Sequence, residues 1–253
     1  MVSEKLAIEF SDVTVRYGDK VALDRLSIRV PERSILGVVG PANSGKTTML
    51  KCVNRTLEFA EGASIEGVVS VGGKDVSQIK NVYELRRKVG MVFPLPVGLP
   101  LSIYENVAYA PRRAGMNNRA ELDQLIEKCL RQAMLWDEVK DRLNSLGTKL
   151  SGGQQQRLTL ARALSHQPDV LCLDEFSIAI DPVTTMKIED VLQELRNEMT
   201  IVLVTNLVQQ AKRLADQTLF LNDSEMVEFG ATEKMFNSPD NPLTGDYLNG
   251  EFG

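Results

Sequence analysis

A glycine-rich segment supplies the clearest chemistry in the sequence. Residues 40–47 read Gly-Pro-Ala-Asn-Ser-Gly-Lys-Thr, which is the spacing of a phosphate-binding loop. Such a loop curls its backbone N–H groups around phosphate oxygens, and the helix after it adds the positive end of its dipole. The pattern predicts that Lys46 reaches the phosphates of a nucleotide and that the Thr47 hydroxyl binds Mg²⁺. The predicted nucleotide-binding residues here are Gly40, Pro41, Ala42, Asn43, Ser44, Gly45, Lys46, Thr47 and Thr48.

Two carboxylates follow an apolar run later in the chain. Residues 170–175 read Val-Leu-Cys-Leu-Asp-Glu, which predicts a buried strand that ends in two acids. Asp174 is predicted to hold Mg²⁺ together with Thr47, and Glu175 is predicted to act as the base beside an attacking water. Acidic residues also end strands in proteins that bind no nucleotide. The catalytic interpretation of this pair therefore depends on the phosphate-binding loop elsewhere in the chain.

The most specific string spans residues 150–157, which read Leu-Ser-Gly-Gly-Gln-Gln-Gln-Arg. It resembles the signature of ABC ATPases. That resemblance implies a head-to-tail dimer in which ATP lies between the phosphate-binding loop of one subunit and the signature of the other. Ser151, Gly152, Gly153 and Gln154 would then meet the γ-phosphate from the partner subunit, with a hydroxyl and N–H groups at a helix N-terminus. Ser151 could equally serve as the N-cap of that helix, and the two roles are compatible.

The resemblance extends over almost the whole chain. Tyr17 stands where the family has an aromatic ring that stacks on adenine, and Asp181-Pro182 matches the end of the family's D-loop, although Asp-Pro also begins ordinary helices well. Segments 84–93, 102–109, 135–143 and 246–253 are similar to the ATP-binding subunit of bacterial phosphate importers. The resemblance implies ATP-driven import of phosphate or a similar oxyanion, by a homodimer or a heterodimer that docks on membrane-spanning permease subunits at the cytoplasmic face of the membrane.

Three positions depart from the family pattern. Pro94 replaces the Q-loop glutamine, Asn206 replaces the switch histidine, and Ile178 replaces the D-loop serine. Proline offers no amide, and asparagine can donate a hydrogen bond but cannot carry the charge or the proton of an imidazole. The predicted catalytic residues are Glu175, Lys46 and Asn206, and the replacements at 94 and 206 predict slow hydrolysis.

Several readings of the function compete at this point. The leading one is a transport ATPase, and the second is a degenerate ATP-binding subunit that dimerises but hydrolyses poorly, as a regulatory or asymmetric half-site. A DNA-associated ABC ATPase would need long coiled-coil or zinc-bearing insertions between the motifs, which the sequence lacks. The signature string argues against a phosphate-loop kinase.

The elements that must position these residues follow from the pattern of apolar residues. Short β-rich runs between residues 6 and 39 predict antiparallel strands at the start of the chain. The last run, Ile35–Val39, predicts a strand that is followed by the phosphate-binding loop and then by a helix over 47–56. After residue 150, strands alternate with helices, which predicts a parallel sheet. The expected fold is α/β: a phosphate-loop nucleotide-binding core with an antiparallel β subdomain over 1–93 and 151–253, and an inserted α-helical subdomain over 94–150. The tail from Asn237 is expected to be irregular.

Composition limits the remaining possibilities. The 253 residues are 43% hydrophobic and 25% charged, as in an ordinary globular domain. Apolar runs are far shorter than a membrane span requires, and the first ten residues lack a secretory signal. A net charge of −5 disfavours broad nucleic-acid binding. Three isolated cysteines predict reduced core thiols, and the single histidine offers no zinc site, so a cytoplasmic ATP- and Mg²⁺-dependent protein is expected.

Overall fold

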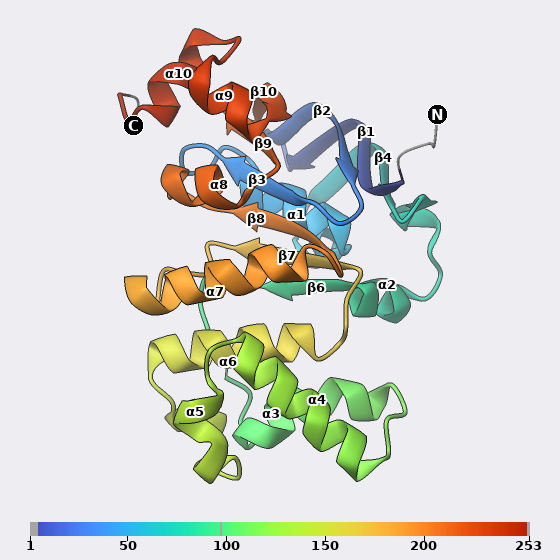
Figure 1. Cartoon of the computed structure of the whole chain (residues 1–253). Helices are drawn as coiled ribbons and strands as arrows, with labels where there is room; N and C mark the ends of the chain where they lie inside the picture. The colour runs from blue at the N-terminus through green and yellow to red at the C-terminus, as the bar shows by residue number, and fades with distance from the viewer. Residues whose placement is uncertain (1–4, 97, 252–253) are drawn as a thin grey trace.

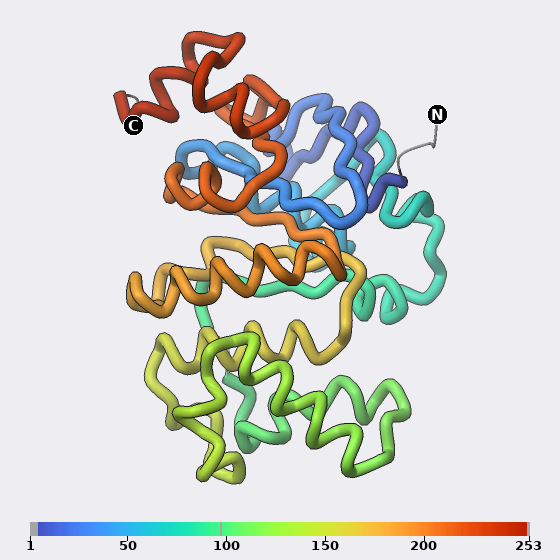
Figure 2. The backbone as a smooth tube through the Cα atoms, viewed as in Figure 1, coloured from blue at the N-terminus to red at the C-terminus, as the bar shows by residue number. Residues whose placement is uncertain are grey.

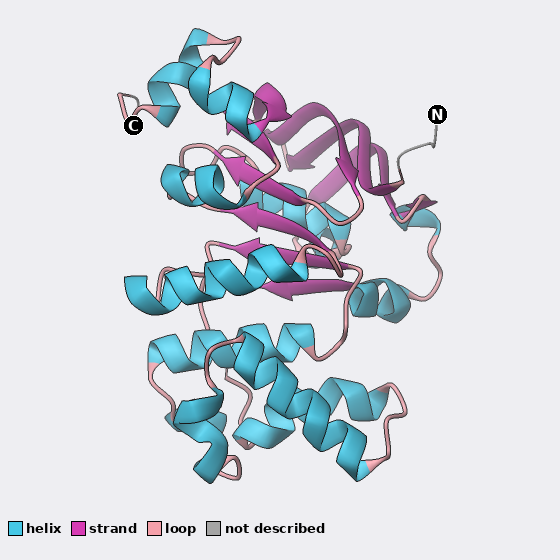
Figure 3. Ribbon diagram, viewed as in Figure 1, coloured by secondary structure: helices cyan, strands magenta, loops and turns pink. Residues whose placement is uncertain are grey.

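One mixed sheet of ten strands organises residues 5–96 and 98–251, the part of the chain that this computed structural model describes (Figures 1 and 3). The strand order is β5-β4-β1-β2-β10-β9-β3-β8-β7-β6. The strands are β1 (Leu6–Tyr17), β2 (Lys20–Pro31), β3 (Ile35–Val39), β4 (Ala63–Val71), β5 (Lys74–Asp75), β6 (Val89–Val92), β7 (Val170–Asp174), β8 (Thr200–Val204), β9 (Gln217–Asn222) and β10 (Glu225–Ala231).

Helices cover the sheet and form a separate lower layer in Figure 1. The α-helices of the described residues are α1 (Lys46–Val53), α2 (Val82–Lys88), α3 (Ile103–Arg113), α4 (Arg119–Gln132), α5 (Trp136–Val139), α6 (Gly152–Leu164), α7 (Pro182–Leu195), α8 (Val208–Leu214), α9 (Thr232–Asn237) and α10 (Pro242–Leu248). Short 3₁₀ turns lie at Thr56–Phe59, Val76–Gln78, Lys140–Arg142 and Gly147–Lys149.

The centre of the sheet is parallel. Strands β6, β7, β8, β3 and β9 pair in parallel in that order, and every residue of β3, β7 and β8 is buried. Two hydrophobic clusters explain this burial, because one packs α1 against the sheet and the other packs α6 and α7 against it. Parallel strands need such cover on both faces, so the predicted alternation of strands and helices is confirmed.

The antiparallel part is built on longer strands than the sequence pattern predicts. The β-rich runs at residues 7–10 and 13–16 predict two short strands, but both belong to the single strand β1, which pairs with β2 and β4. Register shifts near Phe10 and Val13 in both ladders explain why the alternation of apolar residues is interrupted there. Tyr17, at the end of β1, is thereby placed near α1.

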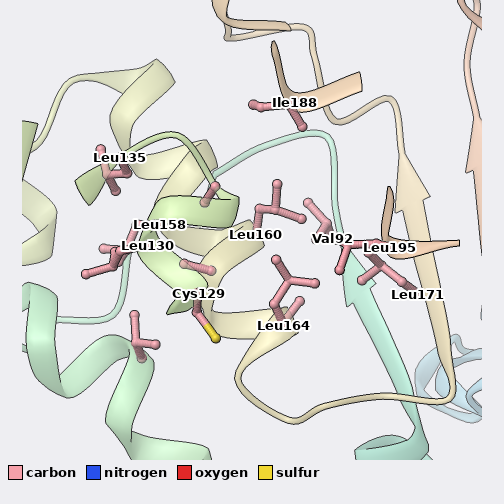
Figure 4. Close-up of a cluster of buried hydrophobic side chains, with 14 of the residues drawn as sticks. Val92, Cys129, Leu130, Leu135, Leu158, Leu160, Leu164, Leu171, Ile188 and Leu195 are labelled. Carbon is pink, nitrogen blue, oxygen red and sulfur yellow. The ribbon is translucent and has the colours of Figure 1, made fainter. Parts of the chain in front are cut away.

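The helical layer shares its core with the sheet. The i, i+3, i+4 spacing of apolar residues in α4 predicts one buried face. The structure confirms it, since the members of this face are buried: Leu122, Leu125, Ile126, Cys129 and Leu130, followed by Ala133. Figure 4 shows Cys129 and Leu130 near Leu158, Leu160 and Leu164 of α6, with Val92 of β6 and Leu171 of β7 beyond them. Helix α6, which begins at the signature string, therefore lies between the sheet and helices α3 and α4.

The C-terminal segment corrects one expectation. The tail was predicted to be irregular, but α10 begins at Pro242 after the N-cap Asn241, whose side chain accepts a hydrogen bond from the Leu243 N–H. Proline is accepted at the first position of a helix, so it marked a helix start and not a break. The course of the chain in Figure 2 brings this segment beside β9 and β10, where the rings of Phe220 and Tyr247 stack at 4.7 Å. Residues 252 and 253, which end the matching segment 246–253, lie outside the described residues.

Candidate nucleotide-binding site

Three neighbouring strands bring the predicted site residues together. Strands β3, β8 and β7 are adjacent and parallel, so their carboxyl ends lie at one edge of the sheet. The phosphate-binding loop follows β3, Asp174 ends β7, and Asn206 lies two residues after β8. Loops at this edge are where open α/β sheets bind their ligands.

The glycines of the loop are required by close backbone approaches. A Cβ atom on Gly40, where φ is +151°, would lie 2.0 Å from the Leu221 carbonyl oxygen. A Cβ atom on Gly45, where φ is +104°, would lie 2.4 Å from the Ala22 carbonyl oxygen. These positions let the loop turn tightly between β3 and α1, which is what a phosphate cradle needs.

Lys46 is held inside this loop as the first residue of α1. Its ammonium group donates hydrogen bonds to the carbonyl oxygens of Gly40 and Pro41, at 2.7 Å each. Burial lowers the pKa of Lys46, and the negative charges of Glu175 and Asp174 act in the opposite direction. The ammonium therefore lies inside the curl of the loop, at the place where the sequence predicts phosphate contact.

Unused donors surround the same loop. Gly45, the N-cap of α1, has no side chain that could accept hydrogen bonds from the first turn of the helix. The N–H groups of that turn therefore remain available to another acceptor. The buried hydroxyl of Ser44 has no hydrogen-bond partner among the described residues. Buried polar groups are normally paired, so both observations fit a loop that is completed by the oxygens of a phosphate group.

Thr47 and Asp174 meet at the metal position that the sequence predicts. The Thr47 hydroxyl donates to Oδ2 of Asp174 at 2.8 Å. Burial raises the pKa of Asp174, while the hydrogen bond from Thr47 lowers it. Within the described residues no three acidic, histidine or cysteine side chains form a metal-binding cluster, and a hydroxyl with one carboxylate suits Mg²⁺, which keeps waters and shares nucleotide oxygens.

Glu175 and Asn206 form the polar pair beyond this position. The Asn206 side-chain amide donates to Oε1 of Glu175 at 2.5 Å. Glu175 has a φ of +46°, and its backbone N–H donates to the Val204 carbonyl at 2.9 Å. This left-handed conformation at the strand end directs the chain away from the sheet, and strain of this kind gathers at functional sites. Asn206 is thus in direct contact with the predicted base.

The signature lies apart from the phosphate-binding loop within this chain. Ser151 N-caps α6 in a capping box, in which its hydroxyl accepts the Gln154 N–H at 3.3 Å and the Gln154 side chain accepts the Ser151 N–H at 3.1 Å. No hydrogen bond between described residues joins 151–154 to 40–48. A Cβ atom on Gly153 would lie 2.7 Å from the Ala179 carbonyl oxygen, so the loop after Glu175 packs directly on the first turn of α6.

Tyr17 stands beside the helix that follows the loop. Its hydroxyl lies 3.4 Å from Oγ1 of Thr48, and its half-buried ring borders the hydrophobic cluster around α1. This arrangement places an aromatic face near the start of α1, where the sequence expects the base of a nucleotide.

Gln156 makes a contact between the signature helix and β6 that the sequence reasoning missed. Its buried side chain donates to the Phe93 carbonyl oxygen at 2.9 Å, and its own Oε1 has no partner among the described residues. The contact ties α6 to the end of β6, directly before Pro94. The signature string contained this glutamine, but only the packing of α6 under β6 shows what it contacts.

Comparison with known proteins decides the family. The pattern of the family described as "ABC transporter" matches residues 23–177, which is more than half of the chain. The chain belongs to the ABC transporter family. The predicted motifs of this ABC transporter chain lie within residues 23–177 or directly beside them. The predicted family is confirmed.

Curated relatives narrow the similarity within the ABC transporter family. The chain is 43% identical over 252 residues to the "Phosphate import ATP-binding protein PstB" of Shewanella denitrificans, covering 99% of this chain and 93% of the relative. It is 46% identical over 238 residues to "Phosphate import ATP-binding protein PstB 3" of Streptococcus pneumoniae, covering 94% and 95%. These relatives confirm the predicted resemblance to phosphate importers and support the predicted activity of an ABC ATPase.

Solved structures confirm the predicted fold. An ATP-binding cassette solved as a dimer in a post-hydrolysis state with ADP and Pi aligns with a TM-score of 0.78 and 27% identity, over 89% of this chain and 98% of that chain. A bacterial Atm1-family ABC exporter with ATP bound aligns with a TM-score of 0.84 and 23% identity, over 99% of this chain and 43% of the exporter. Among the described residues no helix is both long and apolar enough to cross a bilayer.

Proposed function

We propose that this ABC transporter chain is the ATP-binding and ATP-hydrolysing subunit of an importer for inorganic phosphate or a similar oxyanion. The meeting of Lys46, Thr47, Asp174 and Glu175 at the ends of adjacent strands supports this proposal most strongly. Both relatives are named as phosphate import proteins, which supports phosphate as the transported substrate. The cofactors are ATP and Mg²⁺.

Each side chain has a role that its position allows. Lys46 exchanges the carbonyl oxygens of Gly40 and Pro41 for the β- and γ-phosphates, and the N–H groups of the loop hold the remaining oxygens. Thr47 and Asp174 hold Mg²⁺, which when bound neutralises charge on the phosphates. Glu175 accepts a proton from the attacking water. Tyr17 stacks on the adenine ring.

A second subunit completes the site in this proposal. Ser151, Gly152, Gly153 and Gln154 lie at the solvent-accessible start of α6 without contact to their own phosphate-binding loop. A head-to-tail partner, either a second copy or a related ATPase, places its signature on the γ-phosphate instead. The dimeric cassette with 27% identity supports this arrangement.

The domain boundaries and the location are part of the same proposal. Residues 1–93 and 151–253 form the nucleotide-binding core with the β subdomain, and 94–150 form the helical subdomain that leads to the signature. Because the relatives are named import proteins, the subunit is placed at the inner face of the cell membrane, where it docks on permease subunits.

A degenerate subunit with weak hydrolysis is the second candidate, because Asn206 binds the proposed base and Pro94 offers no amide. Steady-state phosphate release separates the two candidates, with Glu175→Gln as the inactive reference. Hydrolysis well above that reference, and an ATP-dependent dimer by gel filtration only in Glu175→Gln, are expected for a transport ATPase. If the wild type and Glu175→Gln release phosphate at equal rates, or if the wild type already forms a stable ATP-bound dimer, the chain is a degenerate subunit.

A further inference from the structure

The described C-terminal residues 246–251 belong to the resemblance to phosphate importers, but the proposed nucleotide chemistry uses none of them. Tyr247 of α10 is the large side chain of this segment, and it is only 8% exposed. A tyrosine hydroxyl normally finds a hydrogen-bond partner when the ring is buried. The ring and the hydroxyl of Tyr247 therefore both need partners inside the fold.

The ring of Tyr247 packs against the central sheet. It stacks on Phe220 of β9, with 4.7 Å between the ring centroids and 18° between the planes. Both rings belong to one hydrophobic cluster, whose buried members are Val39, Ala211, Phe220, Met235, Tyr247 and Leu248. Val39 is the last residue before the phosphate-binding loop, and Ala211 belongs to α8, which begins shortly after Asn206. Together with α9, helix α10 therefore packs on both elements that lead to the nucleotide site (Figure 1).

The hydroxyl of Tyr247 meets the first residue of the phosphate-binding loop. Burial raises the pKa of Tyr247, a hydrogen bond with the Gly40 backbone lowers it, and the negative charge of Glu175 raises it. A backbone group lowers the pKa of a phenol when its N–H donates to the phenol oxygen, because the donor stabilises the charged form. The Gly40 N–H is therefore donated to the Tyr247 hydroxyl, on the side of the site that carries the proposed base.

Gly40 is held from three sides. Its Cα lies against β9, because a Cβ atom there would be 2.0 Å from the Leu221 carbonyl oxygen. Its own carbonyl oxygen accepts a hydrogen bond from the Lys46 ammonium at 2.7 Å, and its N–H is donated to Tyr247. Gly40 is buried, and a buried backbone N–H that loses its acceptor is costly. Movement of Gly40 would therefore move the start of the loop and the partner of Lys46 with it.

We propose that Tyr247 is a positioning residue of the nucleotide site, whose hydroxyl fixes Gly40 and so holds the phosphate-binding loop in the conformation that receives the phosphates. This inference rests on the proposed function, because it adds a residue to the same nucleotide site. Tyr247 acts through Gly40 and not on the nucleotide itself. A loop that is held in its binding conformation binds more tightly, because less ordering is needed when the ligand arrives. The C-terminal helix thereby contributes to nucleotide affinity.

Tyr247→Phe tests the proposal, because it keeps the ring that stacks on Phe220 and removes only the hydroxyl. Nuclear magnetic resonance of protein labelled with ¹⁵N-glycine measures hydrogen exchange of the Gly40 amide without nucleotide. The exchange should be about tenfold faster in Tyr247→Phe than in the wild type, because the amide loses its acceptor. Calorimetric titration with ADP and Mg²⁺ should show affinity weakened about twofold to tenfold, the range expected for one net hydrogen bond.

Two control variants separate positioning from packing. Leu248→Ala removes a buried side chain from the same helix and cluster but keeps the hydroxyl, so it should lower the Tm more than Tyr247→Phe and change the ADP affinity less. Tyr104→Phe removes the hydroxyl of another tyrosine that is 8% exposed. That hydroxyl donates to Asp123 at 2.6 Å in the helical layer, so this variant should leave the Gly40 exchange and the ADP affinity unchanged.

The outcomes that overturn the proposal are distinct from failure of the nucleotide site. If Tyr247→Phe has the Gly40 exchange or the ADP affinity of the wild type, the hydroxyl does not position the loop. If Leu248→Ala weakens ADP binding as much as Tyr247→Phe does, the C-terminal helix contributes packing alone, and the proposal is again overturned. Failure of the proposed nucleotide site would instead appear as equal ADP binding by the wild type and Lys46→Ala, whereas the exchange of Gly40 is measured without any nucleotide.

Discussion

Adjacent glycines at the start of α6 should respond to alanine in opposite ways. Both are helical, so alanine fits the backbone at either position. A Cβ atom on Gly153 would lie 2.7 Å from the Ala179 carbonyl oxygen, whereas a Cβ atom on Gly152 would meet nothing within 4 Å. Ordinary contact begins at 3.4 Å, so Gly153→Ala must displace the loop after Glu175 by several tenths of an ångström.

The size of the effect follows from this clash. Overpacking of a closely packed site costs about 1–3 kcal/mol, and the higher helix propensity of alanine returns at most about 1 kcal/mol. Gly153→Ala should therefore lose about 1–2 kcal/mol of unfolding free energy, and its Tm should fall by about 2–8 °C at roughly 2–4 °C per kcal/mol for a chain of this size. Gly152→Ala should match the wild type or exceed it slightly.

Two measurements check this contrast. Differential scanning calorimetry of both variants without nucleotide should show the lower Tm only for Gly153→Ala. Phosphate release should nevertheless fall for Gly152→Ala as well, because the added methyl group would face the partner's γ-phosphate in the proposed dimer. If the two variants melt alike, the loop after Glu175 does not pack on the signature turn, and the reasoning is refuted.

Lys46→Ala should abolish ATP binding, because it removes the buried ammonium from the loop; unchanged affinity by calorimetric titration would contradict the assignment of the loop. Asn206→His should raise kcat by up to about 10²–10³, the effect of one hydrogen-bond donor to the transition state, with little change in ATP affinity. Pro94→Gln should raise kcat further mainly when the permease is present. Phosphate release by the wild type, the two single variants and the double variant tests this, and identical rates would mean that both replacements are tolerated. The three thiols are buried, and burial raises the pKa of each to about 12, so a thiol reagent at pH 8 should label none of them until denaturant is added; rapid labelling of the native protein would contradict their burial. Because the folded-state pKa of His166 lies below its ordinary 6.5, the unfolded chain binds the extra proton first, so the wild type should lose stability as pH falls through 6.5; His166→Gln should flatten that part of the Tm profile, and an unchanged slope would show that other groups cause it.

Local patterns in the sequence were sufficient where the chemistry is local. The glycine-containing loop between β3 and α1, the strand ending at Asp174 and the helix N-cap at Ser151 each depend on residues a few positions apart, because a turn, a strand end and a helix cap are formed within one segment. The same holds for the buried stripe of α4, since a helix repeats its inner face every three to four residues. These features were predicted correctly, with ends that differ by one to three residues in the structure.

Contacts between distant segments were decided only by the tertiary structure. The order of the sheet places β7 beside β8, and this is what brings Asn206 to Glu175 across 31 positions of the chain. The packing of α6 under β6 gives Gln156 its partner at Phe93, and no spacing rule connects those two residues. Sequence periodicity records which face of a segment is buried, but the choice of partner depends on how whole elements pack, which is a property of the complete core.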